Sequence, residues 1–255
     1  MKKILAVLVN YGDEQLSFLY KVVDELRTFS NYDVTIVVNS NIELDIEGVD
    51  HVNVIELDNY QLLPMTCRQV IDLEADNFDY FIYSENDHLW REHHVDKFIE
   101  YESILPENRI AGLIQYEEDN TGKYYPAYHA SYEWDYNSVE EYNGKKFAHF
   151  TNVHQASFII SKNKLIKIKE TKDFSQFFGN DQYSLKCKTN TDIFLHSNMK
   201  KVICISEFDL NLIHHLPNHY INGADGYRLD DGSIGKRAKQ RSDDTRMQKA
   251  LKKLL

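Results

Sequence analysis

Apolar and polar residues alternate along the first part of the chain with two different periods. A continuous aliphatic run at residues 4–9 is typical of a strand that is buried on both faces. The apolar residues that follow recur every three or four positions and predict a helix with one inward face: Leu16, Leu19, Tyr20, Val23 and Leu26. A second buried strand is predicted at 33–38. The chain therefore opens with a predicted β-α-β unit.

The alternation continues through the next segments of the chain. A third strand is predicted at 51–57, and a helix follows from near Pro64, because proline is tolerated in the first turn. This helix carries Val70 and Ile71 inward, and a fourth strand follows at 79–83. In the less regular second half we expect strands at 110–115, 153–161 and 201–206, and helices at 162–171 and 181–188. Short links between alternating elements predict an α/β fold with a mostly parallel central sheet flanked by helices.

Length and composition exclude several classes of protein. The chain has 255 residues, and no stretch reaches the roughly 18 uncharged apolar residues that cross a bilayer. Its basic and apolar beginning resembles a signal peptide, but polar residues at 10–14 interrupt the apolar run, so we interpret it as a strand. The net charge of −11 argues against nucleic-acid binding, which needs clustered cations. Three scattered cysteines indicate no disulfide framework, and we expect a cytoplasmic protein.

The last twenty residues differ from the rest. Residues 236–255 hold eight Lys or Arg and two Asp, while the remainder of the chain is strongly acidic. Their apolar residues share one helical face: Met247, Ala250, Leu251 and Leu254. This pattern predicts a basic amphipathic helix, which can lie on an anionic membrane, dock onto the protein itself or mediate dimerisation. We therefore expect one domain at 1–235 and a C-terminal tail at 236–255.

Polar side chains follow the predicted strands. Asn10, Tyr11 and Asp13 come after the first strand, and Asn39 comes after the second. In open α/β sheets, ligands bind at the carboxyl ends of the strands, which makes these residues candidates for ligand contact. Asp13 is also placed to cap the helix that follows it.

The segment Glu85-Asn86-Asp87 follows the fourth strand and carries the strongest chemical signal. Residues two apart in an extended chain point to the same side, so both carboxylates can address one ion. Such oxygen ligands suit Mg²⁺ or Mn²⁺, and the upstream Arg68 can hold a diphosphate. The alternative interpretation is a solvated acidic turn.

At these residues the chain resembles the nucleotide-sugar glycosyltransferases of the GT-A fold. Arg68 matches the arginine on the helix before their fourth strand, and Glu85-Asn86-Asp87 matches their D-x-D motif with Glu in place of the first Asp. Gly179-Asn180-Asp181-Gln182 resembles their acceptor-side motif. Among His214, His215 and His219, His215 is our choice for their late histidine. The resemblance spans roughly residues 1–220.

The resemblance implies a GT-A-like (Rossmann-like) sheet with a smaller second sheet, a donor half at 1–115 and an acceptor half at 116–235. It implies Mn²⁺ or Mg²⁺ at Asp87 and His215, and Asp181 as the base of an inverting transfer. A nucleoside-diphosphate sugar, with a UDP-sugar favoured, is the implied donor, and a glycan or lipid-linked glycan the acceptor, as in polysaccharide biosynthesis. The implied donor-binding residues are Asn10, Tyr11, Asp13, Asn39, Arg68 and Glu85.

Several residues have a second interpretation. The segment 116–150 is rich in aromatic and acidic residues, so Trp134 and Glu117 are candidates for acceptor contact, or the segment is a β-hairpin excursion with core aromatics. Asp181 can also be a helix cap. A cluster at His88, His93 and His94 invites a zinc hydrolase interpretation, but no H-E-x-x-H occurs, and we expect these histidines at the surface or in contacts around the site.

Two other functions remain open. One is a non-catalytic sugar- or nucleotide-binding protein of the same fold, which is consistent with the loss of the first Asp. The other is a nucleotidyltransferase, which is less favoured because no Gly-rich basic loop follows the first strand.

Overall fold

The chain divides into two compact units in a computed structural model. The structure describes residues 1–120, 122–126, 133–154, 156–178, 184–218, 220 and 244–255. The first unit comprises Met1–Gly112 and Val153–Lys201, and the second comprises Leu113–Asn152 and Val202–Leu255. The predicted border at residue 115 is close to the first division. However, Val153–Lys201 returns to the first unit, and the C-terminal tail belongs to the second.

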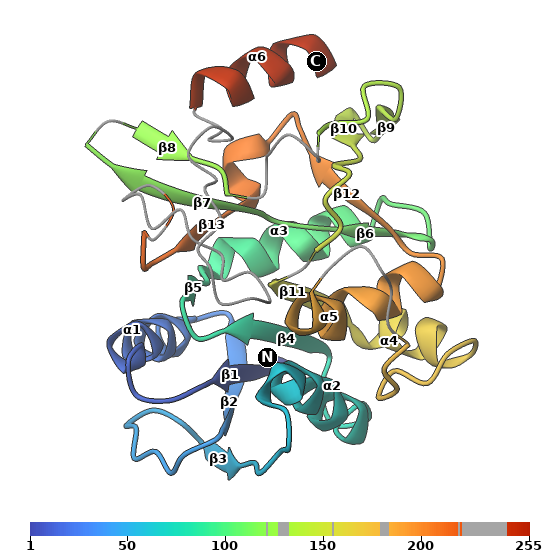
Figure 1. Cartoon of the computed structure of the whole chain (residues 1–255). Helices are drawn as coiled ribbons and strands as arrows, with labels where there is room; N and C mark the ends of the chain where they lie inside the picture. The colour runs from blue at the N-terminus through green and yellow to red at the C-terminus, as the bar shows by residue number, and fades with distance from the viewer. Residues whose placement is uncertain (121, 127–132, 155, 179–183, 219, 221–243) are drawn as a thin grey trace. The chain divides into compact units, whose positions relative to one another are not determined.

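A five-stranded sheet forms the centre of the first unit (Figure 1). Its order is β11-β4-β1-β2-β3, and only β11 runs antiparallel to its neighbour. The strands are β1 (Lys2–Asn10), β2 (Tyr32–Ser40), β3 (His51–Val54), β4 (Tyr80–Glu85) and β11 (Ser157–Ser161). The predicted mostly parallel central sheet is therefore confirmed. Two strands are shorter than predicted: β3 ends at Val54 and not at residue 57, and β11 begins at Ser157 and not at residue 153.

The centre of this sheet explains its aliphatic sequence. β1 pairs with β2 on one side and with β4 on the other, so Ile4 lies beside both Val34 and Tyr80. Side chains from Ile4 to Leu8 are almost completely buried. A central parallel strand is covered on both faces, and this is why the run is continuously apolar.

In the part of the first unit that the structure describes there are five α-helices: α1 (Leu16–Arg27), α2 (Leu63–Leu73), α3 (Glu92–Glu102), α4 (Lys162–Lys169) and α5 (Leu185–His196). The 3₁₀ turn η1 (Tyr60–Leu62) and the short strands β5 (His88–Leu89) and β6 (Arg109–Ala111) complete it. The predicted inward face of α1 is mostly right, but Tyr20 is exposed. Asp13 does not cap α1 with its side chain: Gln15 is the N-cap residue, and only the Asp13 backbone carbonyl accepts a hydrogen bond, from Leu16 N.

Helix α2 begins as predicted, with Pro64 in its first turn. Its inward face carries Cys67, Arg68 and Ile71, all fully buried, whereas Val70 is partly exposed. An arginine therefore takes a position that helical spacing reserves for apolar side chains.

Short strands make up the sheets of the second unit. β7 (Ile114–Asp119) pairs antiparallel with β8 (Gly122–Tyr124) and parallel with β13 (Leu212–His215). β10 (Lys145–Ala148) pairs antiparallel with β9 (Glu140–Tyr142) and with the end of β12 (Lys200–Cys204). The 3₁₀ turn η2 (Phe208–Asn211) and helix α6 (Asp244–Leu254) belong to this unit as well. A single strand at 110–115 was predicted wrongly, because β6 ends at Ala111 and β7 begins at Ile114.

Helix α6 packs its apolar face into the core of the second unit. The four predicted apolar residues are all buried there, with Trp134, Phe150 and Phe208 in the same cluster. Lys253 Nζ lies 3.7 Å from the centre of the Tyr136 ring. Because the apolar face is covered by the protein, it is not available for insertion into a membrane, and that expectation is wrong for this face. Within the described residues, no helix is long and apolar enough to span a bilayer.

Candidate functional site

The strand order of the sheet in the first unit reverses at β1. From β1 the chain continues to β2 and β3 on one side, and it later returns to β4 on the other side. Crevices at such switch points, beyond the carboxyl ends of the strands, are where open α/β sheets bind ligands. Here the Asn86 side-chain amide donates to Asn10 Oδ1 at 2.7 Å, and Asn10 Nδ2 donates to Ser40 Oγ at 3.3 Å. Asn10 therefore ties together the chain at the ends of β1, β2 and β4.

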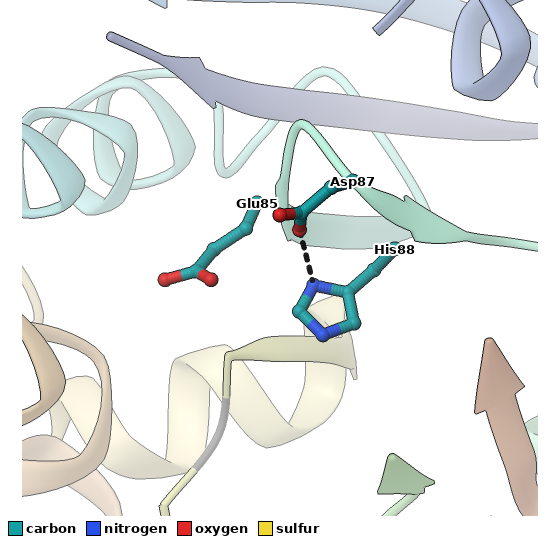
Figure 2. A group of neighbouring side chains, drawn as sticks. All are labelled: Glu85, Asp87 and His88. Carbon is teal, nitrogen blue, oxygen red and sulfur yellow. Dashed lines mark ion pairs between the residues drawn. The ribbon is translucent and has the colours of Figure 1, made fainter. Parts of the chain in front are cut away.

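Three side chains gather at the end of β4 (Figure 2). Glu85, Asp87 and His88 offer ligand atoms that lie within 4.8 Å of one another. Asp87 Oδ1 is 3.3 Å from His88 Nδ1, and both residues are buried. Two carboxylates and an imidazole fit a first-row divalent cation such as Mn²⁺. His88 was expected at the surface or in contacts around the site; it is buried beside Asp87 and adds a third candidate ligand.

Glu85 also forms an ion pair with α5. Lys186 Nζ lies 3.1 Å from Glu85 Oε1. Burial raises the pKa of the Glu85 carboxyl, but the charges of Lys186 and His88 outweigh it and hold that pKa below its usual value. The Glu85 charge in turn raises the pKa of Lys186. Both members of the pair are therefore charged at neutral pH.

A cavity of about 580 Å³ adjoins this pair, entirely within the first unit. It is lined by Val9, Tyr11, Glu14, Gln15, Asp58, Asn59, Tyr60, Gln61, Leu63, Pro64, Glu85, Asn86 and Lys186. Its size is that of sites for drug-sized ligands. The rings of Tyr11 and Tyr60 have centroids 5.5 Å apart, and they place two aromatic surfaces at the cavity. Among the described residues that line it there are three carboxylates and one ammonium, which together have a formal charge of −2.

The predicted donor-binding residues are only partly brought together. Tyr11 and Glu85 both line the cavity, and their roles in donor binding stay predictions. Asn39 does not: it is fully buried, its Nδ2 donates to Thr66 Oγ1 at 2.8 Å, and its Oδ1 accepts from Asn53 Nδ2 at 2.9 Å. Asn10 is also buried, and Asp13 is exposed outside the lining. Asn10 and Asn39 hold the strand ends in place.

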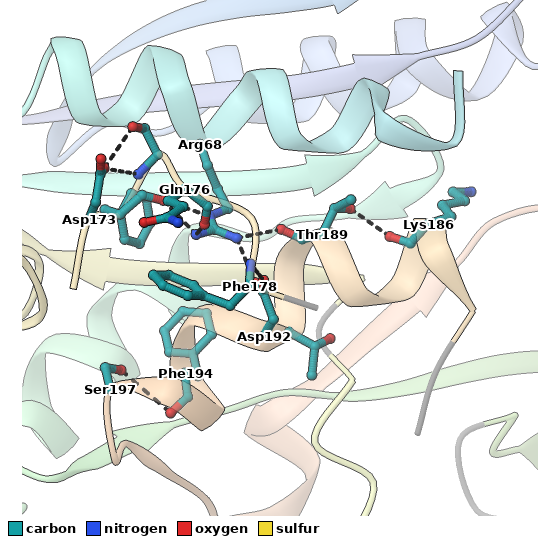
Figure 3. A network of polar contacts seen from close by, with 12 residues as sticks. Arg68, Asp173, Gln176, Phe178, Lys186, Thr189, Asp192, Phe194 and Ser197 are labelled. Atoms are coloured by element: carbon teal, nitrogen blue, oxygen red, sulfur yellow. Dashed lines mark hydrogen bonds and ion pairs between the residues drawn. The ribbon is translucent and has the colours of Figure 1, made fainter. Parts of the chain in front are cut away.

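Arg68 does not have the role that the resemblance implied (Figure 3). Its side chain is 0% exposed, and Nη1 lies 2.6 Å from Asp192 Oδ1. The remaining N–H groups donate to the carbonyl oxygens of Phe174, Gln176 and Thr189. All five donors are used within the first unit, so none is left for a diphosphate. Arg68 connects α2 to α5 and to the segment that precedes α5.

Two of the predicted residues in the second unit, Glu117 and His215, form a buried pair. His215 Nδ1 lies 2.6 Å from Glu117 Oε1, and Glu117 Oε2 accepts from the backbone N–H of Tyr220 at 2.9 Å. Glu117 is completely buried, so its expected contact with an acceptor does not fit this structure. A carboxylate partner of this kind fixes the orientation of an imidazole. The role of His215 as a metal ligand stays a prediction.

Trp134 is part of a hydrophobic core and not of a sugar-binding surface. It is 3% exposed, and its ring centroid is 5.1 Å from that of Phe150. The alternative interpretation of 116–150, strand hairpins with core aromatics, is therefore the right one for this residue. Stacking on an acceptor requires an exposed ring face, which Trp134 lacks.

Other predictions fall outside the described residues. These include Asp181 with the whole motif at 179–182, and also His219. The structure adds Lys186 and Tyr60 to the candidates. A sequence signal existed for the loop at Asp58 and Asn59, because it is a polar cluster after a strand, but nothing local distinguished Lys186 from the other lysines of the chain.

Comparisons with known proteins give matches among solved structures only. No protein-family model and no curated protein matches the sequence. Among solved structures, the crystal structure of residues 1–349 of the glycosyltransferase TarS from S. aureus is similar, with a TM-score of 0.48 and 11% sequence identity. The alignment covers 86% of this chain and 62% of that chain. This chain thus spans less than two thirds of the TarS structure, and similarity of this extent assigns it neither activity nor substrate.

Proposed function

We propose that this chain is a glycosyltransferase that takes a sugar from a nucleoside diphosphate, with UDP favoured, and needs Mn²⁺ or Mg²⁺ to do so. The observation that carries the proposal is the cluster of Glu85, Asp87 and His88 beside a cavity at the ends of β1 and β4. The resemblance of Glu85-Asn86-Asp87 to a D-x-D motif supports the same reaction class. A glycan or a lipid-linked glycan is the proposed acceptor.

Charge supports the need for a cation. The described residues of the cavity lining have a formal charge of −2, which opposes a diphosphate, and Asp87 adds to the negative charge beside it. A divalent cation held by Asp87, His88 and Glu85 neutralises this excess and gives the phosphate oxygens a ligand. When bound, it also stabilises the negative charge that develops on the departing nucleoside diphosphate.

The residues of the chain have separate tasks in this proposal. Tyr11 and Tyr60 offer ring faces to the base, and the amide bridge between Asn10 and Asn86 fixes the end of β4 against β1. Asp181 is the proposed base that removes the proton of the acceptor hydroxyl, which gives inversion at the anomeric carbon. This last assignment depends on the resemblance alone.

Calorimetric titration of UDP with and without Mn²⁺ tests the proposal. We expect the wild-type protein to bind UDP with Mn²⁺ and Asp87→Asn to bind it at least about tenfold more weakly, because one charged ligand of the cation is lost. Asp13→Asn, an exposed residue outside the cavity lining, is the matched control and retains wild-type affinity. If the wild-type protein binds no nucleoside diphosphate under either condition, the proposal is wrong.

A non-catalytic nucleotide-binding protein is the second candidate. It is favoured by one observation: the arginine that the resemblance assigned to the diphosphate is committed elsewhere. Hydrolysis of a UDP-sugar, measured as released UDP, separates the two candidates. Turnover that Asp181→Asn abolishes supports the enzyme, whereas tight UDP binding without turnover of UDP-glucose, UDP-galactose or UDP-N-acetylglucosamine supports the binding protein.

A further inference from the structure

Lys186 is the single cation among the described residues that line the cavity. The other charged residues of the lining are the carboxylates Glu14, Asp58 and Glu85. A phosphorylated ligand needs positive partners in its site, and this ammonium is the one that the lining offers. The lysine also lies in the first turn of α5, where the helix dipole favours anions.

The contacts of Arg68 support Lys186 as the residue that contacts a phosphate. Arg68 uses all its donors inside the protein, so it cannot approach a ligand without breaking a buried ion pair. Lys186 differs: its side chain is 55% exposed, and a lysine ammonium moves on a flexible stem. Figure 3 shows Lys186 at the start of α5 and Asp192, the partner of Arg68, further along the same helix.

Glu85 belongs to two groups of atoms at once. One Glu85 carboxylate oxygen pairs with Lys186, and a Glu85 carboxylate oxygen also lies within 4.8 Å of ligand atoms of Asp87 and His88. A cation and Lys186 therefore compete for the same negative charge. A cation that draws Glu85 toward itself leaves the ammonium of Lys186 available to another anion.

We propose that Lys186 binds the phosphates of the donor, and that its ion pair with Glu85 holds it away from them until a divalent cation takes Glu85. The inference rests on the proposed function and deepens it. It makes Glu85 a residue with two successive partners, Lys186 and then the cation. Binding of the cation and of the nucleotide is consequently cooperative, because each favours the state in which the ion pair is open.

Titrations of UDP and of uridine, each with and without Mn²⁺, test this exchange. For Lys186→Met we expect UDP affinity to fall roughly tenfold and uridine affinity to stay unchanged, because uridine carries no phosphate. Lys186→Arg, which keeps the charge, restores much of the UDP affinity. Lys188→Met is the control, because this lysine is on the same helix but outside the cavity lining.

Glu85→Gln gives changes of opposite sign in the two conditions. Without metal, UDP binds several-fold more tightly, because Lys186 is released from its partner. With Mn²⁺, UDP binds more weakly than to the wild-type protein, because a cation ligand is lost. In the double variant Glu85→Gln with Lys186→Met, the metal-free gain disappears. Melting temperatures of all variants show whether each one is folded.

The outcomes separate this inference from the proposed function. If the wild-type protein binds UDP and Lys186→Met binds it equally well, the inference is overturned while the proposed function stands. The same holds if Glu85→Gln weakens metal-free UDP binding. If the wild-type protein binds no UDP under any condition, the proposed function itself fails.

Discussion

Helix α5 carries two ion pairs with opposite characters. In the first turn, Lys186 pairs with Glu85 of β4, and both side chains are partly exposed. Further along, Asp192 pairs with Arg68 of α2, and both are completely buried. A buried pair is costly to break because it leaves a charge without solvent, whereas an exposed pair contributes little to stability. We therefore expect the buried pair to stabilise the fold, whereas the partly exposed pair can exchange partners at little cost in stability.

Replacement of Arg68 and replacement of Lys186 should change the free energy of unfolding by very different amounts. Arg68→Met removes the cation that pairs with the buried Asp192 carboxylate and the donors to several buried carbonyl groups, and we expect a loss of about 3–5 kcal/mol in the free energy of unfolding. Lys186→Met should cost less than about 1 kcal/mol. Urea denaturation followed by circular dichroism measures both. Equal losses for the two variants would remove the distinction drawn between the pairs.

Lys201 extends the comparison to a buried lysine. Lys201 is buried near the start of β12, and its Nζ donates to the backbone oxygen of His154 at 3.2 Å. Burial lowers the pKa of its ammonium to about 7. In the unfolded chain its pKa is about 10.4. Between these values the unfolded chain binds more protons than the folded protein, so this residue makes the free energy of unfolding rise as pH rises from about 7 to 10.

Lys201→Met tests this assignment. It removes the titrating group, so we expect the rise in unfolding free energy between pH 7 and pH 9 to shrink by about 1–3 kcal/mol. Urea denaturation at the two pH values gives the difference. Lys200→Met, at the neighbouring and more exposed position of the same strand, is the control and should keep the wild-type pH dependence. A slope that Lys201→Met leaves unchanged would contradict the assignment.

Cys67 and Cys187 are the sequence neighbours of Arg68 and Lys186, so the rates at which their thiols react report how accessible the two ion-pair positions are. Cys67 precedes Arg68 and is completely buried, and burial raises its thiol pKa. Cys187 follows Lys186 and is partly exposed; burial raises its pKa, but His154 and Ser184 outweigh this and lower it. Iodoacetamide should therefore modify Cys187 well before Cys67 in the folded protein, because the thiolate is the reactive form.

Peptide mass spectrometry after brief alkylation at neutral pH measures the order of labelling. Cys204, which is also buried, is an internal control and should stay protected together with Cys67. In urea all three should react at similar rates. Labelling of Cys67 ahead of Cys187 in the folded protein would mean that the α2 position is more open than its burial indicates.

The sequence was a good guide where one local pattern decides the structure. The aliphatic run of β1 and the apolar face of α6 were predicted from their spacing alone, because burial on two faces or on one face leaves a direct trace in the pattern. The position of Glu85 and Asp87 at a strand end was predictable for the same reason. The end of β4 follows from the end of its apolar residues.

The sequence was a poor guide where a distant partner decides a role. We expected Arg68 to hold a diphosphate, but its side chain is buried against Asp192, which is 124 positions away. Trp134 lies in a segment rich in aromatic and acidic residues, which suggested sugar binding. It is instead part of a hydrophobic core, because residues of α6, from the far end of the chain, pack into the same cluster. Lys186 on α5 became a candidate only through its ion pair with Glu85 at the end of β4. Long-range pairing of this kind leaves no local periodic signal.

The packing of α6 has a practical consequence for anyone who shortens this protein. Met247 and Leu251 fill the same cluster as Trp134 and Phe150, so deletion of residues 244–255 would open a hydrophobic surface on the second unit. A truncated form should therefore precipitate or be digested quickly by trypsin, although it keeps every residue of the cavity. Crystallisation efforts would do better to retain this helix and to shorten other segments.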